Sequence, residues 1–142
     1  MDIHIQLESH VAEVVAKMRD IAQKRMVEAV NEVRNTTLKT LSGERTGRIY
    51  TIPGTHRTYT ASSPGEPPAQ RLGELRQSVS TLVVGRGDSL TGAVGTDKKY
   101  GPMLEYGTKK YGTKNMAARP WLRPSFEKAE ASVKAIFERE WF

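Results

Sequence analysis

The sequence predicts an α+β fold in which a small antiparallel sheet packs against a long N-terminal helix and a C-terminal helix, with a long proline-rich loop. Three patterns support this prediction. The N-terminal part carries apolar residues at three- and four-residue steps, the spacing of one helix face. The middle holds short β-prone segments in pairs, separated by turn residues. The C-terminal end returns to helical spacing.

A long amphipathic helix is predicted after Ser9, which suits the N-cap position. No Pro or Gly follows before Gly43, although the weak helix formers at 35–37 favour an end near Arg34. A helix of this length carries more apolar surface than one small sheet covers, which indicates packing between subunits. Before the helix, three apolar residues alternate with polar ones, as in a short strand or an extended arm: Ile3, Ile5 and Leu7.

Two antiparallel pairs of strands are predicted in the middle of the chain. Residues 48–52 and 57–60 form the first pair, with turn residues at 53–56 between them. Residues 78–85 and 89–95 form the second pair, across a glycine-containing turn.

The segment between these pairs reads as a loop. Residues 61–70 contain three prolines and a glycine, which disfavour both a strand ladder and a helix, so an extended mobile loop is expected. Residues 71–76 are predicted to form a short helical turn.

The stretch from Tyr100 to Pro124 combines prolines, aromatic residues and arginines. Each proline fixes φ and removes an amide donor, so we expect a rigid path that is neither a strand nor a helix interior. Trp, Tyr and Arg dominate interface energetics, which favours contact with a partner, although Trp121 and Leu122 also fit an ordinary core. Pro124 suits the first turn of a C-terminal helix that runs to about Glu140.

The composition describes one globular domain, residues 1–142, with a thin core. The chain has 142 residues, no cysteine and a formal net charge of +6. Residues 97–124 hold seven basic and two acidic side chains, and therefore +5 of that charge. Such a patch favours an acidic partner or nucleic-acid phosphates. No apolar run approaches about 18 residues and no secretory signal is recognisable, so we expect a cytoplasmic protein without a membrane partner.

No group of catalytic or ligand-binding residues stands out in the sequence. His4, His10 and His56 lie on separate predicted elements, and no pair has the spacing of zinc ligands. A phosphate-binding loop and a nucleophile elbow are both absent. Glu105, beside Tyr106, could act as a general acid or base, but nothing singles it out. We therefore expect no cofactor, no metal and no enzymatic activity.

Two separate segments resemble one protein family when they are taken together. Residues 61–79 read Ala-Ser-Ser-Pro-Gly-Glu-Pro-Pro-Ala, then Leu-Gly-Glu-Leu-Arg-Gln-Ser-Val after two further residues. Residues 94–125 include Leu-Glu-Tyr-Gly-Thr and, later, Arg-Pro-Trp-Leu-Arg-Pro-Ser. Both segments, in this order, are similar to the signatures of the tail-completion or head–tail joining proteins of long-tailed bacteriophages. The resemblance covers roughly residues 60–137. Trp121 stands where that family usually has Phe.

The resemblance implies a structural role in the neck of a virion. Such proteins form a homo-oligomeric ring that joins the DNA-filled head to the tail tube, alongside other neck, connector or tail proteins. A ring needs head-to-tail interfaces whose rotation closes. Assembly would take place in the host cytoplasm, and the protein would remain in the virion.

Two sets of residues are the expected contacts under this hypothesis. The subunit or partner contacts are Pro64, Glu66, Tyr100, Tyr106, Arg119, Trp121 and Arg123. The basic patch, facing DNA in the channel or an acidic partner, is Lys98, Lys99, Lys109, Lys110 and Lys114.

Two other hypotheses remain open at this stage. The lysine-rich loop, with Tyr100, Tyr106 and Tyr111, could bind free nucleic acid by charge and stacking. A small basic ribonuclease would instead need an acid–base pair, for which Glu105 and His56 are the candidates.

Overall fold

The computed structural model describes residues 2–86, 89–109 and 115–142. The elements follow in chain order as α1 (Val11–Ser42), β1 (Ile49–Thr51), β2 (Thr58–Thr60), α2 (Glu74–Ser78), β3 (Ser80–Val84), β4 (Thr91–Gly95), α3 (Tyr100–Tyr106) and α4 (Leu122–Glu138). The predicted α+β class is confirmed. The strands form two separate antiparallel hairpins, β1–β2 and β3–β4, in place of the single sheet that we expected.

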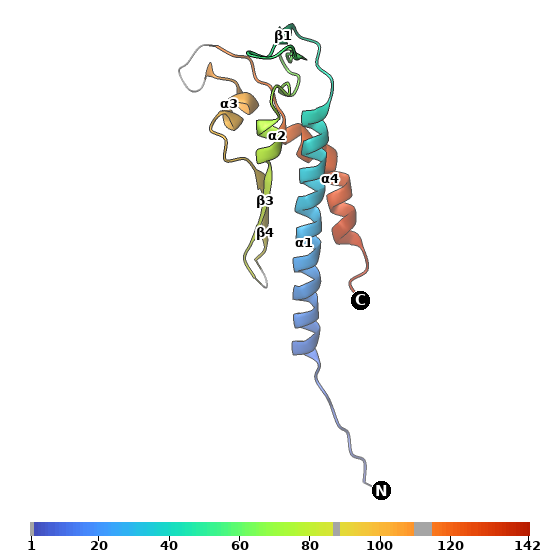
Figure 1. The fold of residues 1–142 in the computed structure, drawn as a ribbon. Coiled ribbons are helices and arrows are strands. Elements are labelled where there is room, and N and C mark those ends of the chain that lie inside the picture. The colour runs from blue at the N-terminus through green and yellow to red at the C-terminus, as the bar shows by residue number, and fades with distance from the viewer. Residues whose placement is uncertain (1, 87–88, 110–114) are drawn as a thin grey trace.

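Helix α1 is the spine of the molecule (Figure 1). Helix α4 packs along it, and the β3–β4 hairpin packs against it as well. Helices α2 and α3 and the β1–β2 hairpin gather toward its C-terminal end, while the N-terminal arm extends away from the opposite end. The chain is therefore elongated, with most of its packing near one end of α1.

Helix α1 begins and ends later than the sequence predicted. It starts at Val11, with His10 rather than Ser9 at the N-cap, and continues beyond Arg34 to Ser42. The threonines that weaken helix propensity are accommodated because their hydroxyls bond back along the helix: Thr37 Oγ1 donates to the Val33 carbonyl at 2.8 Å, and Thr40 Oγ1 donates to the Thr36 carbonyl at 3.1 Å. Packing of this buried stretch decides the outcome against the weak local preference.

The main core lies at the C-terminal end of α1. Its buried members are Leu41, Leu75, Val79 and Trp121. The rim consists of partly buried apolar residues, namely Leu38, Val94, Leu104 and Leu122. These residues come from α1, α2, β4, α3 and α4 and from the positions next to them, so the core joins segments between residues 38 and 122.

Residues 100–106 are helical, so our expectation of an irregular path was wrong for this part of the stretch. Pro102 occupies the first turn of α3, where a missing amide donor costs nothing. The helix ends at Tyr106, and Gly107 directly after it has a φ of +78°. The path from 115 to 120 is irregular, as expected.

The far end of α4 is held by a side chain of α1. The guanidinium of Arg25, which is buried, donates to the carbonyls of Phe137 at 3.2 Å and Arg139 at 2.8 Å, and also to that of Glu140. Its carbon lies 4.5 Å from the centre of the Trp141 ring. These carbonyls belong to the last turn of α4 and the residues after it, which have no partner within the helix. Arg25 therefore acts as a C-terminal cap supplied from outside the helix.

Candidate functional site

Two pieces of the second segment of the resemblance, residues 104–108 and 119–125, meet where α3 approaches the start of α4. The carboxylate of Glu105 accepts hydrogen bonds from the amides of Trp121 at 2.8 Å, Leu122 at 2.9 Å and Arg123 at 3.0 Å. These are the orphan donors of the first turn of α4, and a negative charge is favoured there by the helix dipole. Glu105 thus caps a helix that begins 17 residues downstream of it.

Backbone hydrogen bonds join the segment before residues 110–114 to the segment after them. Residues 110–114 themselves lie outside the described residues. The Thr108 amide donates to the Met116 carbonyl at 3.1 Å, and the Arg119 amide donates to the Leu104 carbonyl at 2.6 Å. Gly107 lies between them, and a Cβ there would stand 2.7 Å from the Met116 carbonyl oxygen. Only glycine fits this left-handed position so close to another backbone segment.

Trp121 belongs to the core. It is 2% exposed, and its indole N–H donates to the Gly101 carbonyl at 3.1 Å. A Cβ on Gly101 would stand 2.5 Å from Cγ2 of Thr96 and 3.5 Å from the Trp121 ring. Trp121 therefore fixes how α3 packs against α4, and any part that it has in a subunit contact is indirect.

The other expected contacts near this corner differ in accessibility. Tyr106 is 65% exposed and Tyr100 is also exposed. Arg123 is exposed and forms an ion pair with Glu127 at 3.6 Å, one helical turn away. Arg119 is partly buried, and its Nη1 atom is buried with no hydrogen-bond partner among the described residues. Tyr100, Tyr106 and Arg123 are the members of this set that can reach a partner directly.

The proline-rich loop is held by two side chains. The Glu66 carboxylate accepts hydrogen bonds from the Thr46 hydroxyl, from the Ser63 amide at 3.0 Å and from the Thr46 amide at 3.1 Å. The Thr46 hydroxyl and these two amides hold the pKa of Glu66 below its ordinary value. Pro64 is exposed at the turn. Mobility of this loop stays a prediction.

Arg45 is the second side chain that holds the loop. Its Nε donates to the Pro67 carbonyl at 2.7 Å, and its Nη2 donates to the carbonyls of Thr40 at 2.8 Å and Pro68 at 3.0 Å. Burial lowers the pKa of this guanidinium, and the nearby charge of Glu66 opposes that shift. Nothing local in the sequence singles out Arg45, because the loop carbonyls that it binds, those of Pro67 and Pro68, are more than 20 residues away.

The expected basic patch is only partly described. Lys98 and Lys99 immediately precede α3, and Lys109 follows it. Lys99 and Lys109 are exposed, and Lys98 is half-buried. Lys110 and Lys114 lie outside the described residues. Contact between this patch and DNA or an acidic partner stays a prediction.

An open groove of about 830 Å³ lies beside the capped corner, and the sequence did not predict it. Met26, Val30 and Val33 of α1 contribute one side of it. Residues from β4, α3 and α4 complete the lining: Leu90, Thr91, Gly92, Val94, Glu105, Tyr106, Leu122, Arg123, Phe126, Val133 and Phe137, together with Ala29 of α1. Phe126 is 53% exposed at this groove. We call this feature the α1–α4 groove.

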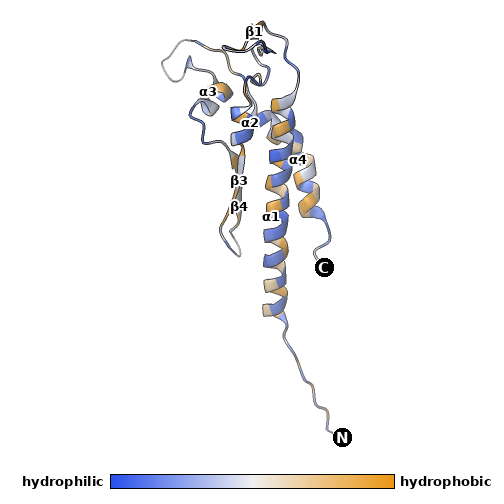
Figure 2. Cartoon of the chain, viewed as in Figure 1, coloured by the Kyte–Doolittle hydropathy of each residue, from blue (hydrophilic) through white to orange (hydrophobic). Residues whose placement is uncertain are grey.

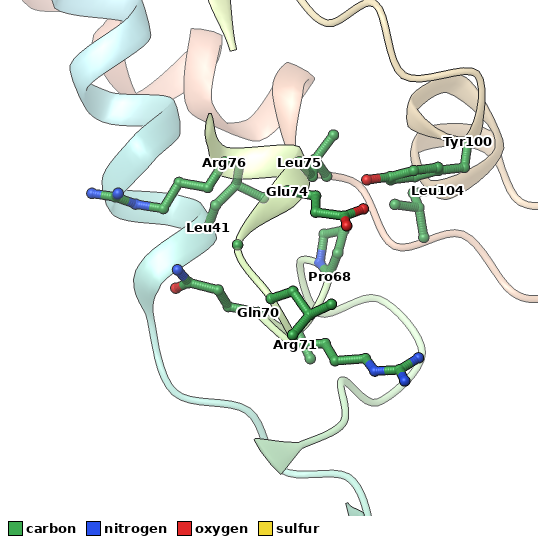
Figure 3. A pocket seen from close by; sticks show the side chains of 12 residues that line it. Leu41, Pro68, Gln70, Arg71, Glu74, Leu75, Arg76, Tyr100 and Leu104 are labelled. Carbon is green, nitrogen blue, oxygen red and sulfur yellow. The ribbon is translucent and has the colours of Figure 1, made fainter. Parts of the chain in front are cut away.

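A second, smaller hollow of about 370 Å³ lies around α2 (Figure 3). Leu41, Pro68 and Leu75 line it together with Tyr100 and Leu104 of α3. The guanidinium of Arg76 is directed toward α1, where its Nε donates to the Ser42 hydroxyl at 2.8 Å. The hollow therefore borders the main core, and the polar side chains of Gln70, Arg71 and Glu74 also line it.

Within the described residues, the candidate metal-ligating and acid–base side chains do not converge on one site. Within ranges 2–86, 89–109 and 115–142, no three His, Cys, Asp or Glu residues lie close enough together to hold a metal ion. Both oxygens of the Glu105 carboxylate are engaged by the α4 amides, and His56 is exposed in the turn between β1 and β2. No helix in the described part of the chain is long and apolar enough to cross a bilayer.

Comparison with known proteins gave no match: no family model, no curated protein and no solved structure corresponds to this chain.

Proposed function

We propose that this protein is a structural subunit of a bacteriophage or prophage neck, which assembles into a homo-oligomeric ring and joins the DNA-filled head to the tail tube. The observation that carries this proposal is the apolar surface that a single chain leaves uncovered. Proteins that act alone in solution seldom expose apolar residues contiguously over several elements. A subunit of an assembly exposes such residues when it is viewed alone, because its neighbours cover them in the assembly.

The uncovered surface begins at the N-terminal end of α1. All residues from 11 to 20 are exposed, including Val11, Val14, Val15 and Met18. Figure 2 shows that apolar positions continue along this part of α1, beyond the tip of the β3–β4 hairpin. An apolar stripe on a helix end that faces water is unfavourable, so we infer that a neighbouring subunit covers it.

The β3–β4 hairpin adds to this surface. Leu82 is 60% exposed and Val84 is also exposed, and both lie on the hairpin face that points away from α1. Among the described residues each strand pairs only with the other, which leaves the outer edges of β3 and β4 open. A two-stranded hairpin with an apolar outer face is marginal alone and is stabilised by further strands or by packing.

The capped corner supports the family resemblance in physical terms. Two pieces of the second segment, residues 104–108 and 119–125, form one unit in which Glu105 caps α4, Gly107 permits a close backbone approach and Trp121 fills the core. The two segments of the resemblance also meet, because Leu75 and Val79 of residues 61–79 pack with Trp121 of residues 94–125 in the main core. This packing supports a common structural plan.

The test is to remove the protein from an assembling phage or prophage and to image the particles. We expect filled heads and free tails that do not join, with infectivity restored when the full chain is supplied. We also expect the chain to be present at the joint of purified virions. Normal infectious virions without the protein would overturn the proposal.

Binding measurements on the purified protein distinguish the neck hypothesis from the nucleic-acid-binding alternative. Under the neck hypothesis, contact with DNA is non-specific and secondary to assembly. Strong binding of free DNA or RNA that falls steeply with salt, together with absence from virions, would favour a nucleic-acid-binding protein instead.

A further inference from the structure

The α1–α4 groove has the form of a slot for one extended strand. Strand β4 contributes one side and is paired only with β3 within the described residues, so its other edge is free. Gly92 lets this strand lie close to α1, since a Cβ there would stand 2.5 Å from Cγ1 of Val30 and 2.7 Å from the Met26 sulfur. Helix α4 contributes the other side, through Phe126, Val133 and Phe137. An open strand edge beside an apolar floor is the arrangement that accepts an added strand.

The N-terminal arm, residues 2–8, has the pattern of such a strand. Ile3, Ile5 and Leu7 are 79–92% exposed and alternate with polar residues. In an extended chain these three side chains share one face, and Asp2, His4, Gln6 and Glu8 take the other face. Residues 3–7 match β4 in length, since each has five residues and would span about 17 Å. The arm therefore fits the slot in length and in pattern.

The arm cannot occupy the groove of its own chain. Val11 and Met26 are separated by 15 helical steps (26 minus 11) of continuous helix, which is about 22 Å. Leu7 is four residues before Val11 and can reach back no more than about 14 Å. Even a fully folded-back arm leaves Leu7 short of the groove, so residues 3–7 cannot all lie in the groove of their own chain, and an arm that fills the groove comes from another copy.

We propose that residues 2–8 of one copy lie along the free edge of β4 in the α1–α4 groove of a second copy, with Ile3, Ile5 and Leu7 facing its apolar floor. This contact adds detail to the proposed function. It rests on that function only because it requires copies of the chain to associate with one another. It is head-to-tail, because an arm and a groove are different surfaces, and repeated contacts of this type generate a ring when the rotation closes.

The charges on the two surfaces are compatible with this contact. Asp2 and Glu8 give the arm two negative charges. The groove presents the exposed guanidinium of Arg123, which is ion-paired with Glu127 at 3.6 Å, while the Glu105 carboxylate is engaged by the α4 amides. The polar face of the arm would remain at the surface, where its charges stay hydrated.

The test uses disulfide cross-linking between two purified full-length variants. The natural chain has no cysteine, so each variant carries one thiol. One protein carries Ile5→Cys and the other Phe126→Cys, with an affinity tag on one of them so that the mixed dimer is resolved by mass. We expect the mixed dimer to form readily. Gln6→Cys is the matched control, and it should cross-link on the order of tenfold more slowly with Phe126→Cys, because adjacent residues of a strand point to opposite faces.

A single chain that carries both Ile5→Cys and Phe126→Cys gives a second readout. We expect it to form dimers and larger species at concentrations where no disulfide closes within one chain. Equal rates for Ile5→Cys and Gln6→Cys, or closure within one chain, would overturn the inference. Because cross-linking measures the contact in purified protein and particle imaging measures the function, the two can fail separately. If the cross-link forms but the protein is absent from virions, only the neck function is refuted.

Discussion

Gly107 shows how strongly one backbone position can be constrained at the capped corner. Two glycines of this chain have nearly the same dihedral angle, with φ of +78° at Gly107 and +75° at Gly54. They differ in surroundings, because a Cβ at Gly54 would meet nothing within 4 Å whereas one at Gly107 would meet the Met116 carbonyl at 2.7 Å.

Gly107→Ala should therefore cost more than Gly54→Ala. Both variants place a side chain at positive φ, which costs about 1 kcal/mol, and only the first also forces two backbone segments apart, for a total of about 3 kcal/mol. Urea denaturation followed by circular dichroism measures the two free energies of unfolding. Equal losses would mean that the close approach of residues 107 and 116 is absent in solution.

The carboxylate of Glu66 makes stability depend on pH. Its pKa is held below the ordinary value of 4.5 in the folded chain, chiefly by the Thr46 hydroxyl and then by the Ser63 and Thr46 amides. A depressed pKa contributes stability that is present above the unfolded pKa and is lost as pH falls through the folded one. This contribution should therefore be complete at neutral pH and decline below 4.5.

Glu66→Gln should remove that dependence. The difference in free energy of unfolding between the natural chain and the variant is expected to be constant at neutral pH and to shrink as the pH falls below 4.5. Denaturation at a series of pH values gives the curve, with Glu130→Gln on the exposed face of α4 as the control. A difference that grows on acidification would contradict the hydrogen bonding at Glu66.

Helix α4 is fixed at both ends by side chains from earlier in the chain. Glu105 satisfies the amides of its first turn, and Arg25 satisfies carbonyls at its other end. Neither interaction is visible in the sequence of α4, which has no side-chain cap of its own at Trp121. The position of α4, and with it one side of the α1–α4 groove, therefore depends on two distant residues.

Glu105→Ala should destabilise the chain by about 2 kcal/mol, because it leaves three amides of α4 without their acceptor. Glu127→Ala is the matched control. It removes an exposed carboxylate whose ion pair with Arg123 contributes less than about 0.5 kcal/mol. Thermal or urea unfolding distinguishes the two variants. A loss at Glu127 equal to that at Glu105 would argue against the remote cap.

At the scale of the whole molecule, packing is concentrated toward one end. The main core gathers around the C-terminal end of α1, whereas residues 11–20 of the same helix are exposed throughout. Within residues 11–20, Lys17 contacts the Phe142 ring, with its Nζ 5.3 Å from the ring centre. A helix with so little packing is marginal in water, so one continuous helix should contain a stable part and a labile part.

Hydrogen exchange should reveal this division in dilute protein. Amides of residues 11–20 are expected to exchange on the order of 100-fold faster than those of residues 29–41. If neighbouring copies cover the N-terminal part of α1, raising the protein concentration should slow the exchange of residues 11–20 and leave residues 29–41 unchanged. Uniform protection along α1 at low concentration would contradict the division.

Local patterns in the sequence determined much of this protein. Helical spacing identified α1 and α4, turn residues placed both hairpins, and the prolines marked the loop at 61–70. These features depend on neighbours a few residues apart, whose preferences act within one turn or one hairpin. The alternation at Ile3, Ile5 and Leu7 was equally visible, although the chain itself offers this arm no strand partner among the described residues.

Only the tertiary structure decided the remaining features. The helical course of residues 100–106, the extension of α1 to Ser42, the cap by Glu105 and the α1–α4 groove all depend on groups far apart in sequence. Such groups meet only after the helices have packed, because packing and the demand to satisfy buried backbone groups override weak local preferences.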